Sequence, residues 1–153
     1  MELELADTAV RLSAATVAGA ILGINRDLAQ APIGARTLGL VALGSATVTV
    51  ATIQVPGMAE NTDALSRVVQ GVIQGVMAGI SFIGAGVILR IPQEQKVEGL
   101  TTAAAVWVTA ALGIACGLGH WPTVLIAATL AVFLLAGMTW LRDWFRGEKP
   151  DAK

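Results

Sequence analysis

Charged residues divide the chain into apolar stretches whose lengths suit a membrane. The clearest, Val68 to Leu89, contains no Asp, Glu, Lys or Arg over 22 residues. A helix needs about 20 mostly apolar residues to cross about 30 Å of hydrocarbon. After Gly99 the next charged residue is Arg142, too far for one helix, and the Gly- and Pro-containing cluster 117–122 predicts a break between two. The five predicted spans are residues 8–25, 37–55, 68–89, 100–118 and 121–141.

The fold class that follows is all-α, a polytopic transmembrane helical bundle forming one domain over residues 1–153. Composition agrees, because 55% of residues are hydrophobic and only 14% are charged, against roughly 45–50% and 25% in soluble domains. The first residues are acidic, whereas a secretory signal begins with positive charge, so we expect the first apolar stretch to be retained.

Basic residues are unequally shared between the two predicted sides of the membrane. With five spans, Arg11 and Arg67 fall on one side. The other side holds Arg26, Arg36, Arg90, Lys96, Arg142, Arg146, Lys149 and Lys153. Since basic loops stay in the cytoplasm, the N-terminus is expected outside and the C-terminus inside. Trp121 and the Trp140/Trp144 pair fall near predicted boundaries, as interfacial anchors do.

Small residues recur along the predicted spans at the spacing of helix-packing faces. Gly71, Gly75 and Gly79 form one stripe at four-residue intervals, and Gly19 with Gly23 repeat that interval in the first span. The packing candidates are Gly71, Gly75, Gly79, Gly84, Gly86, Gly113 and Gly117. Two alternatives stay open, packing inside one bundle and packing against another subunit or partner helix. Gly84 and Gly86 are also candidates for a helix kink or break.

The spans contain hydroxyls and amides, but none of the 11 acidic residues lies well within one. This pattern disfavours a proton- or metal-coupled pump, which needs intramembrane carboxylates. Gln70 and Gln74 lie one turn apart and are expected to hydrogen-bond a neighbouring helix or to face a watery vestibule. No hydrolase or phosphate-loop motif occurs, so we expect no enzymatic activity and no catalytic residue. Cys116 and His120 are solitary, so no metal site or cofactor is expected, and no basic cluster suggests nucleic-acid binding.

Polar residues gather in the loops predicted to face the cytoplasm. The candidate functional cluster is Arg26, Asp27, Arg36, Thr37, Glu98, Thr101 and Thr102. One interpretation is ordinary: hydroxyls cap the start of the fourth span, and the arginines only set topology. The functional interpretation is a polar site in which Arg26 and Arg36 meet the Asp27 carboxylate or the anionic group of a ligand.

Three sequence blocks resemble the MgtC/SapB family of bacterial inner-membrane proteins. Residues 33–44, IGARTLGLVALG, resemble the family's GLRTHxLVALG block. Residues 79–88, GISFIGAGVI, resemble GIGFLGAGVI, and residues 97–113 resemble VxGLTTAAxLWxTAAxG. The family's GLERE block reads Gly23-Ile24-Asn25-Arg26-Asp27 here, so an amide replaces the first glutamate. The resemblance is to the short form, without the C-terminal cytoplasmic domain of longer members.

The resemblance implies a multi-pass inner-membrane protein linked to magnesium homeostasis, acid or other stress adaptation and, in pathogens, virulence. It further implies a modulator of other membrane machinery, such as the membrane sector of the F-type ATP synthase. The expected partners are membrane lipid, a second copy in a homo-oligomer, with a dimer favoured, and another membrane protein complex.

Two other functions remain open from the residues. The first is a small oligomeric ion or solute carrier, in which Arg36, Ser81, Thr101 and Thr102 line a cytoplasmic mouth. The second is binding of an anionic lipid headgroup by Arg26, Arg36 and Arg90, which share the predicted cytoplasmic side.

Overall fold

The computed structural model describes residues 5–56, 62–91 and 96–137. Within them the chain forms five helices and one short β-hairpin, which confirms the all-α class. The helices are α1 (Leu5–Leu28), α2 (Ala35–Ile53), α3 (Thr62–Val87), α4 (Leu100–Leu118) and α5 (Trp121–Val132), the last continued by a π-helical turn, η1 (Phe133–Gly137). The predicted end of the fifth span, 138–141, lies outside the described residues, as do Trp140, Trp144 and the basic residues from Arg142 onward.

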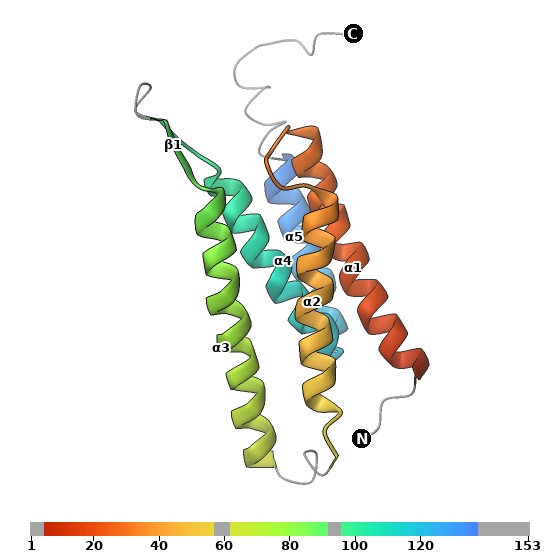
Figure 1. Cartoon of the computed structure of the whole chain (residues 1–153). Helices are drawn as coiled ribbons and strands as arrows, with labels where there is room; N and C mark the ends of the chain where they lie inside the picture. Colours follow the sequence, from red (N-terminus) through yellow and green to blue (C-terminus); the bar gives the residue numbers. More distant parts are fainter. Residues whose placement is uncertain (1–4, 57–61, 92–95, 138–153) are drawn as a thin grey trace.

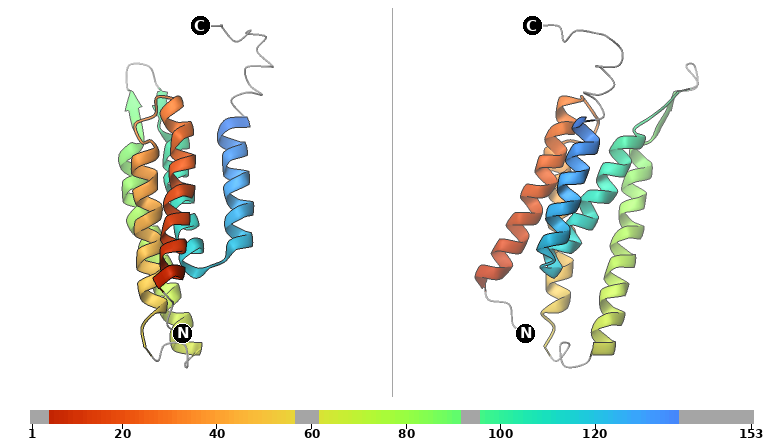
Figure 2. Two further views of the ribbon diagram at one scale, coloured as in Figure 1. Left: turned by 90° about the vertical axis from the view of Figure 1, so that its right-hand side faces the viewer. Right: turned by 180° about the vertical axis from the view of Figure 1, so that it is seen from behind.

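Successive helices run up and down through one elongated bundle (Figure 1). Helices α1 to α4 are each long and apolar enough to cross a membrane, and the continuous α5–η1 helix, Trp121–Gly137, is shorter. Figures 1 and 2 place the end of α1, the start of α2, the hairpin and the start of α4 together. We call this the hairpin end. Arg26 and Arg36 lie there, whereas Arg11 and Arg67 lie toward the opposite end.

A short antiparallel hairpin joins α3 to α4, where the sequence predicted only a polar loop. Strands β1 (Leu89–Ile91) and β2 (Lys96–Glu98) pair with Leu89 opposite Glu98. Gly99 follows β2 with a φ of 86° and begins α4 as its N-cap. A Cβ at this position would meet the Val87 carbonyl oxygen, so glycine is required both by the left-handed backbone and by the close approach of α3.

Helix α4 is the central element of the fold. In its most apolar window 56% of the residues are buried, against 11% for α3. Most of the core consists of side chains from α1, α2 and α4, and Ile80 of α3 and Val124 of α5 complete it. The contributions of α1, α2 and α4 include Ala15, Leu22, Leu38, Ala42, Val106, Ala110, Leu112 and Cys116. Many of these are small, because membrane helices associate through close backbone approach rather than through a hydrophobic effect.

Glycines allow both neighbours of α2 to approach its backbone. A Cβ on Gly19 of α1 would lie 2.5 Å from the Leu38 carbonyl oxygen, and one on Gly117 of α4 would lie 2.7 Å from Thr49 Cβ. Gly113 likewise faces the backbone of Ala42. These distances are too short for a real Cβ. The glycines of α1 and α4 therefore allow both helices to pack directly against the backbone of α2.

Most of the glycines along α3 have no such close neighbour among the described residues. At Gly71, Gly75, Gly79 and Gly86, no described atom lies within 4 Å of the place that a Cβ would occupy. Gly84 makes only ordinary contact, 3.8 Å from Ala103. The interpretation of this stripe as packing inside one bundle is therefore wrong for the four open glycines, because α3 meets α4 mainly near the hairpin end (Figure 1). Packing of the stripe against a second chain stays a prediction.

Helix α3 also differs from its predicted limits and shape. It begins at Thr62, ahead of the expected Val68, and includes Asp63 in its first turn. It continues as an α-helix through Gly84 and Gly86 to Val87, so the candidate break at these glycines is wrong.

Candidate functional site

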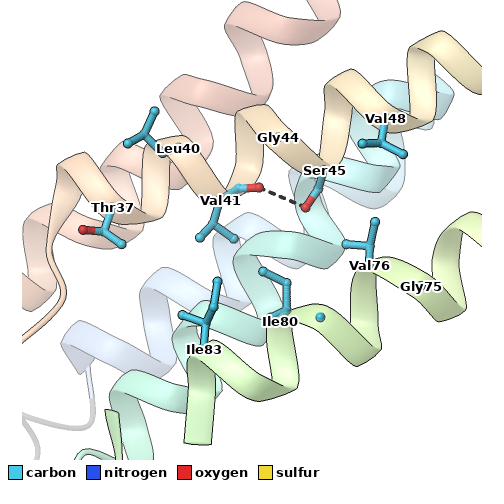
Figure 3. A pocket seen from close by; sticks show the side chains of 11 residues that line it. Thr37, Leu40, Val41, Gly44, Ser45, Val48, Gly75, Val76, Ile80 and Ile83 are labelled. Atoms are coloured by element: carbon cyan, nitrogen blue, oxygen red, sulfur yellow. Dashed lines mark hydrogen bonds between the residues drawn. The ribbon is translucent and has the colours of Figure 1, made fainter. Parts of the chain in front are cut away.

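A groove of about 500 Å³ opens between α2 and α3 (Figure 3). Val41 of α2 and Val76, Ile80 and Ile83 of α3 point toward one another across it (Figure 3). The full lining is Thr37, Leu40, Val41, Gly44, Ser45, Val48, Gly75, Val76, Gly79, Ile80 and Ile83. The groove is therefore almost wholly apolar, and it lies in the part of α2 and α3 toward the hairpin end. Both helices are long enough to span a membrane.

Three glycines leave parts of the groove walls without side chains. Gly44 on α2, like Gly75 and Gly79 on α3, has no described atom within 4 Å of its missing Cβ. Ser45 is buried at the groove, but its hydroxyl donates to the Val41 carbonyl oxygen at 2.9 Å, so its proton is already used (Figure 3). The walls thus offer close backbone approach rather than hydrogen bonds, which suits an apolar helix.

Two side-chain amides stand on the exposed part of α3. Gln70 and Gln74 are exposed, and neither has a hydrogen-bond partner in the part of the chain that the structure describes. The expected bond to a neighbouring helix is therefore not made within the described bundle. Gln74 lies near the middle of α3, at a depth where hydrocarbon cannot hydrogen-bond an amide. In a membrane these amides would need a polar partner from outside the described bundle.

At the hairpin end, Asp27 is engaged with the start of α2. Its Oδ2 accepts a hydrogen bond from the backbone N–H of Ala35 at 2.9 Å. A Cβ on Gly34 would collide with the same carboxylate, so Gly34 makes room for it. Among the described residues Asp27 forms no ion pair, and the expected pairing of its carboxylate with Arg26 or Arg36 is wrong. Its carboxylate instead satisfies one of the free N–H groups of a helix start.

Arg26 is buried in the last turn of α1, with 8% of its surface exposed. Its Nη2 donates to Asn25 Oδ1 at 2.7 Å. Its buried Nε has no hydrogen-bond partner among the residues that the structure describes. The spacing of the sequence showed where this arginine lies along its helix but not that its side chain would be enclosed.

The other members of the predicted cluster are spread around this end. Arg36 and Thr37 are exposed on the first turn of α2, and Thr37 also lines the α2–α3 groove. Glu98 and Thr101 are exposed, whereas Thr102 is buried. The expected hydroxyl cap of the fourth span is wrong, because Gly99 occupies the N-cap position and no side chain caps it.

The residues expected for a carrier mouth do not share the groove. Ser81 is exposed on α3 and donates to the Met77 carbonyl oxygen at 2.8 Å. Ser81, Arg36, Thr101 and Thr102 are all absent from the lining of the α2–α3 groove. The side chain of Arg90 lies outside what the structure describes. Among the described residues, no group of three or more His, Cys, Asp or Glu side chains is placed to hold a metal ion.

Comparison with known proteins gives a consistent set of relatives. A family model described as the MgtC family matches residues 12–144. Over 156 aligned residues the chain is 40% identical to protein SrpB of Synechococcus elongatus, covering 94% of this chain and 85% of that protein. It is 36% identical to protein MgtC of Brucella abortus, covering 90% of this chain and 52% of the relative. For protein MgtC of Salmonella typhimurium the identity is 37%, with 80% and 48% covered.

The chain therefore spans about half the length of the two MgtC relatives but most of the length of SrpB. No solved structure gives a significant match.

Proposed function

Because this chain belongs to the MgtC family, we propose that it is a non-enzymatic modulator of other membrane machinery. It would act in the bacterial inner membrane, with the hairpin end at the cytoplasmic face, by docking an apolar helix against α2 and α3. The family resemblance implies a role in magnesium homeostasis, stress adaptation or virulence, and a partner such as the membrane sector of the F-type ATP synthase.

The observation that carries this proposal is the open face of α3. Its buried residues are Ile80, Gly84 and Val87, all in the half of the helix near the hairpin. The rest of the helix presents Gly71, Gly75 and Gly79 with no neighbour within 4 Å, beside a groove of about 500 Å³. In lipid, a face of small residues gains from a second helix because backbones can then pack closely.

The exposed amides of α3 also support docking of a partner helix on this face. Gln70 and Gln74 have no partner in the described chain, and a hydrogen bond between membrane helices contributes about 0.6 to 2 kcal/mol. A partner helix that brings a polar group to Gln74 and small residues to the glycines would satisfy both features. A second copy of this chain carries both kinds of group, so a homo-oligomer is the simplest assembly that would satisfy them. For the proposed modulator, the partner that matters for function is another membrane protein complex.

The test is a native pull-down of the tagged full chain from its own membranes in mild detergent, analysed by mass spectrometry. We expect the wild-type chain to retain a stoichiometric membrane partner, alone or together with a second copy of the chain. Gly75→Leu and Gly44→Leu fill the groove from its two walls and should abolish the assembly while leaving membrane insertion intact. Ser13→Leu is the matched control, since Ser13 is exposed on α1 and does not line the groove.

The outcomes separate the two functional classes. If the assembly survives both glycine substitutions, the groove is not the docking site for the partner helix. A homo-oligomer with no other protein bound would favour the carrier alternative. That alternative is tested by measuring ion or solute flux in proteoliposomes. Flux above that of empty liposomes would favour transport, and its absence would favour modulation.

A further inference from the structure

Among the described residues, no acidic side chain pairs with the buried guanidinium of Arg26. Its side chain is enclosed, its Nη2 binds a neutral amide oxygen and its Nε has no acceptor. Among the described residues no carboxylate lies within ion-pair distance of it. An ionised group removed from water without a partner costs several kcal/mol, so a site of this kind normally includes an anion.

The acids that the sequence offers nearby do not supply it. Asp27 follows Arg26 directly, but its carboxylate is exposed and accepts the N–H of Ala35. Asn25, which touches the guanidinium, is an amide where the resembling family block has a glutamate. The hydrogen bond from Arg26 to Asn25 therefore carries no compensating negative charge.

The helix ends around Arg26 add no net positive potential. Helices α2 and α4 begin at the hairpin end, and neither has an acidic residue in its first turn or a side-chain cap at its N-cap. Helices α1 and α3, which begin at the opposite end, carry Asp7 and Asp63 in their first turns. However, Asp27 already accepts the first N–H of α2, and α1 and α3 end at the hairpin end with partly negative C-termini. The helix dipoles therefore largely cancel there, and the unpaired guanidinium of Arg26 is the feature that favours an anion.

We infer that Arg26 binds a phosphate group, either in the headgroup of a membrane phospholipid or as free phosphate. The planar guanidinium donates through two parallel N–H groups, a geometry that phosphate oxygens match. Arg26 lies in the last turn of a 24-residue apolar helix, which is the depth of the headgroups in a bilayer.

The test uses the purified full chain and two probes. Native mass spectrometry measures retention of phosphatidylglycerol, with a galactosyl diacylglycerol that lacks phosphate as the comparison lipid. Thermal unfolding in detergent measures stabilisation by inorganic phosphate. Arg26→Gln should reduce retention of phosphatidylglycerol about tenfold or more, the effect of losing a charged hydrogen-bond donor. Arg36→Gln, at an exposed arginine of the same end, is the matched control and should retain the lipid.

A second variant keeps the proposal testable if Arg26→Gln does not fold. Asn25→Asp has nearly the same shape and supplies the missing carboxylate 2.7 Å from the guanidinium, so it should displace the ligand without harming the fold. Selective loss of phosphatidylglycerol in both variants supports a headgroup site. Stabilisation by phosphate alone, abolished by Asn25→Asp, supports a free-phosphate site. Asn25→Asp protein that binds like the wild type, or wild-type protein that binds neither probe, overturns the inference.

Discussion

Arg11 of α1 donates from Nη1 to the carbonyl oxygen of Gly117 in α4, 106 positions away in the sequence, at 2.8 Å. Its Nε donates to Asp7 Oδ2 at 2.7 Å. Gly117 lies in the last turn of α4, where carbonyl oxygens have no partner within the helix. One mostly buried guanidinium, 13% exposed, therefore caps the central helix and ties it to the first.

The Arg11–Gly117 bond gives a first prediction. Arg11→Gln should lower the free energy of unfolding by about 2 kcal/mol, the typical contribution of a hydrogen bond to a charged group. Asp7→Asn is the control, and its effect should be about 0.5 kcal/mol, because the Asp7 side chain is 38% exposed and exposed ion pairs contribute little. Denaturation in mixed detergent micelles measures both. Equal losses would show that the ion pair, and not the helix cap, stabilises the contact.

Gly117 gives a second prediction, because its missing Cβ would lie 2.7 Å from Thr49 Cβ and 3.0 Å from the Ala46 carbonyl oxygen. Gly117→Ala should therefore force α2 and α4 apart and cost about 1–3 kcal/mol of stability. Gly79→Ala, placed in open space on α3, should change the stability of the monomer by no more than about 0.5 kcal/mol. Unfolding of the monomer measures both, and similar losses at the two positions would contradict the packing described.

Thr109 gives a third prediction. It is fully buried in α4, and its Oγ1 has no hydrogen-bond partner within the described part of the chain. Thr49, also buried, donates its hydroxyl proton to the Ser45 carbonyl oxygen at 2.8 Å. Leaving a polar group unpaired costs about 1–3 kcal/mol, so Thr109→Val should raise the unfolding temperature.

Thr49→Val is the matched control and should leave the unfolding temperature unchanged or lower it, because it removes a hydroxyl that already has an acceptor. If Thr109→Val destabilises the protein instead, the hydroxyl has a partner in the membrane, such as a buried water.

Several features of the fold followed from the sequence before any contact was known. The helix start at Leu100 and the end near Leu118 match the prediction, because Gly99 and the Gly119–Pro122 segment are strong local signals. The hairpin between Leu89 and Glu98 was missed. Its strands are three residues each, too short for a periodic pattern to mark them.

The glycine pattern shows where such reasoning stops. Gly71, Gly75 and Gly79 have the same four-residue spacing as Gly113 and Gly117, yet only the second pair touches another helix in the described bundle. Spacing places residues on one face of a helix but does not say what lies opposite that face. In the same way, the sequence placed Asp27 beside Arg26, and the structure turned its carboxylate to Ala35 instead.

The sequence by itself determined that this is a membrane bundle of five helices and which residues stand at each end. The reason is that hydrocarbon excludes charge, so the lengths of uncharged stretches and the positions of arginines follow from a local penalty. Only the tertiary structure decided three further features of the described residues: α3 keeps an open glycine face, Arg11 caps α4, and Arg26 is buried with no carboxylate beside it. Those facts depend on which helices approach one another, and the energy of that approach is shared among many weak contacts across the whole chain.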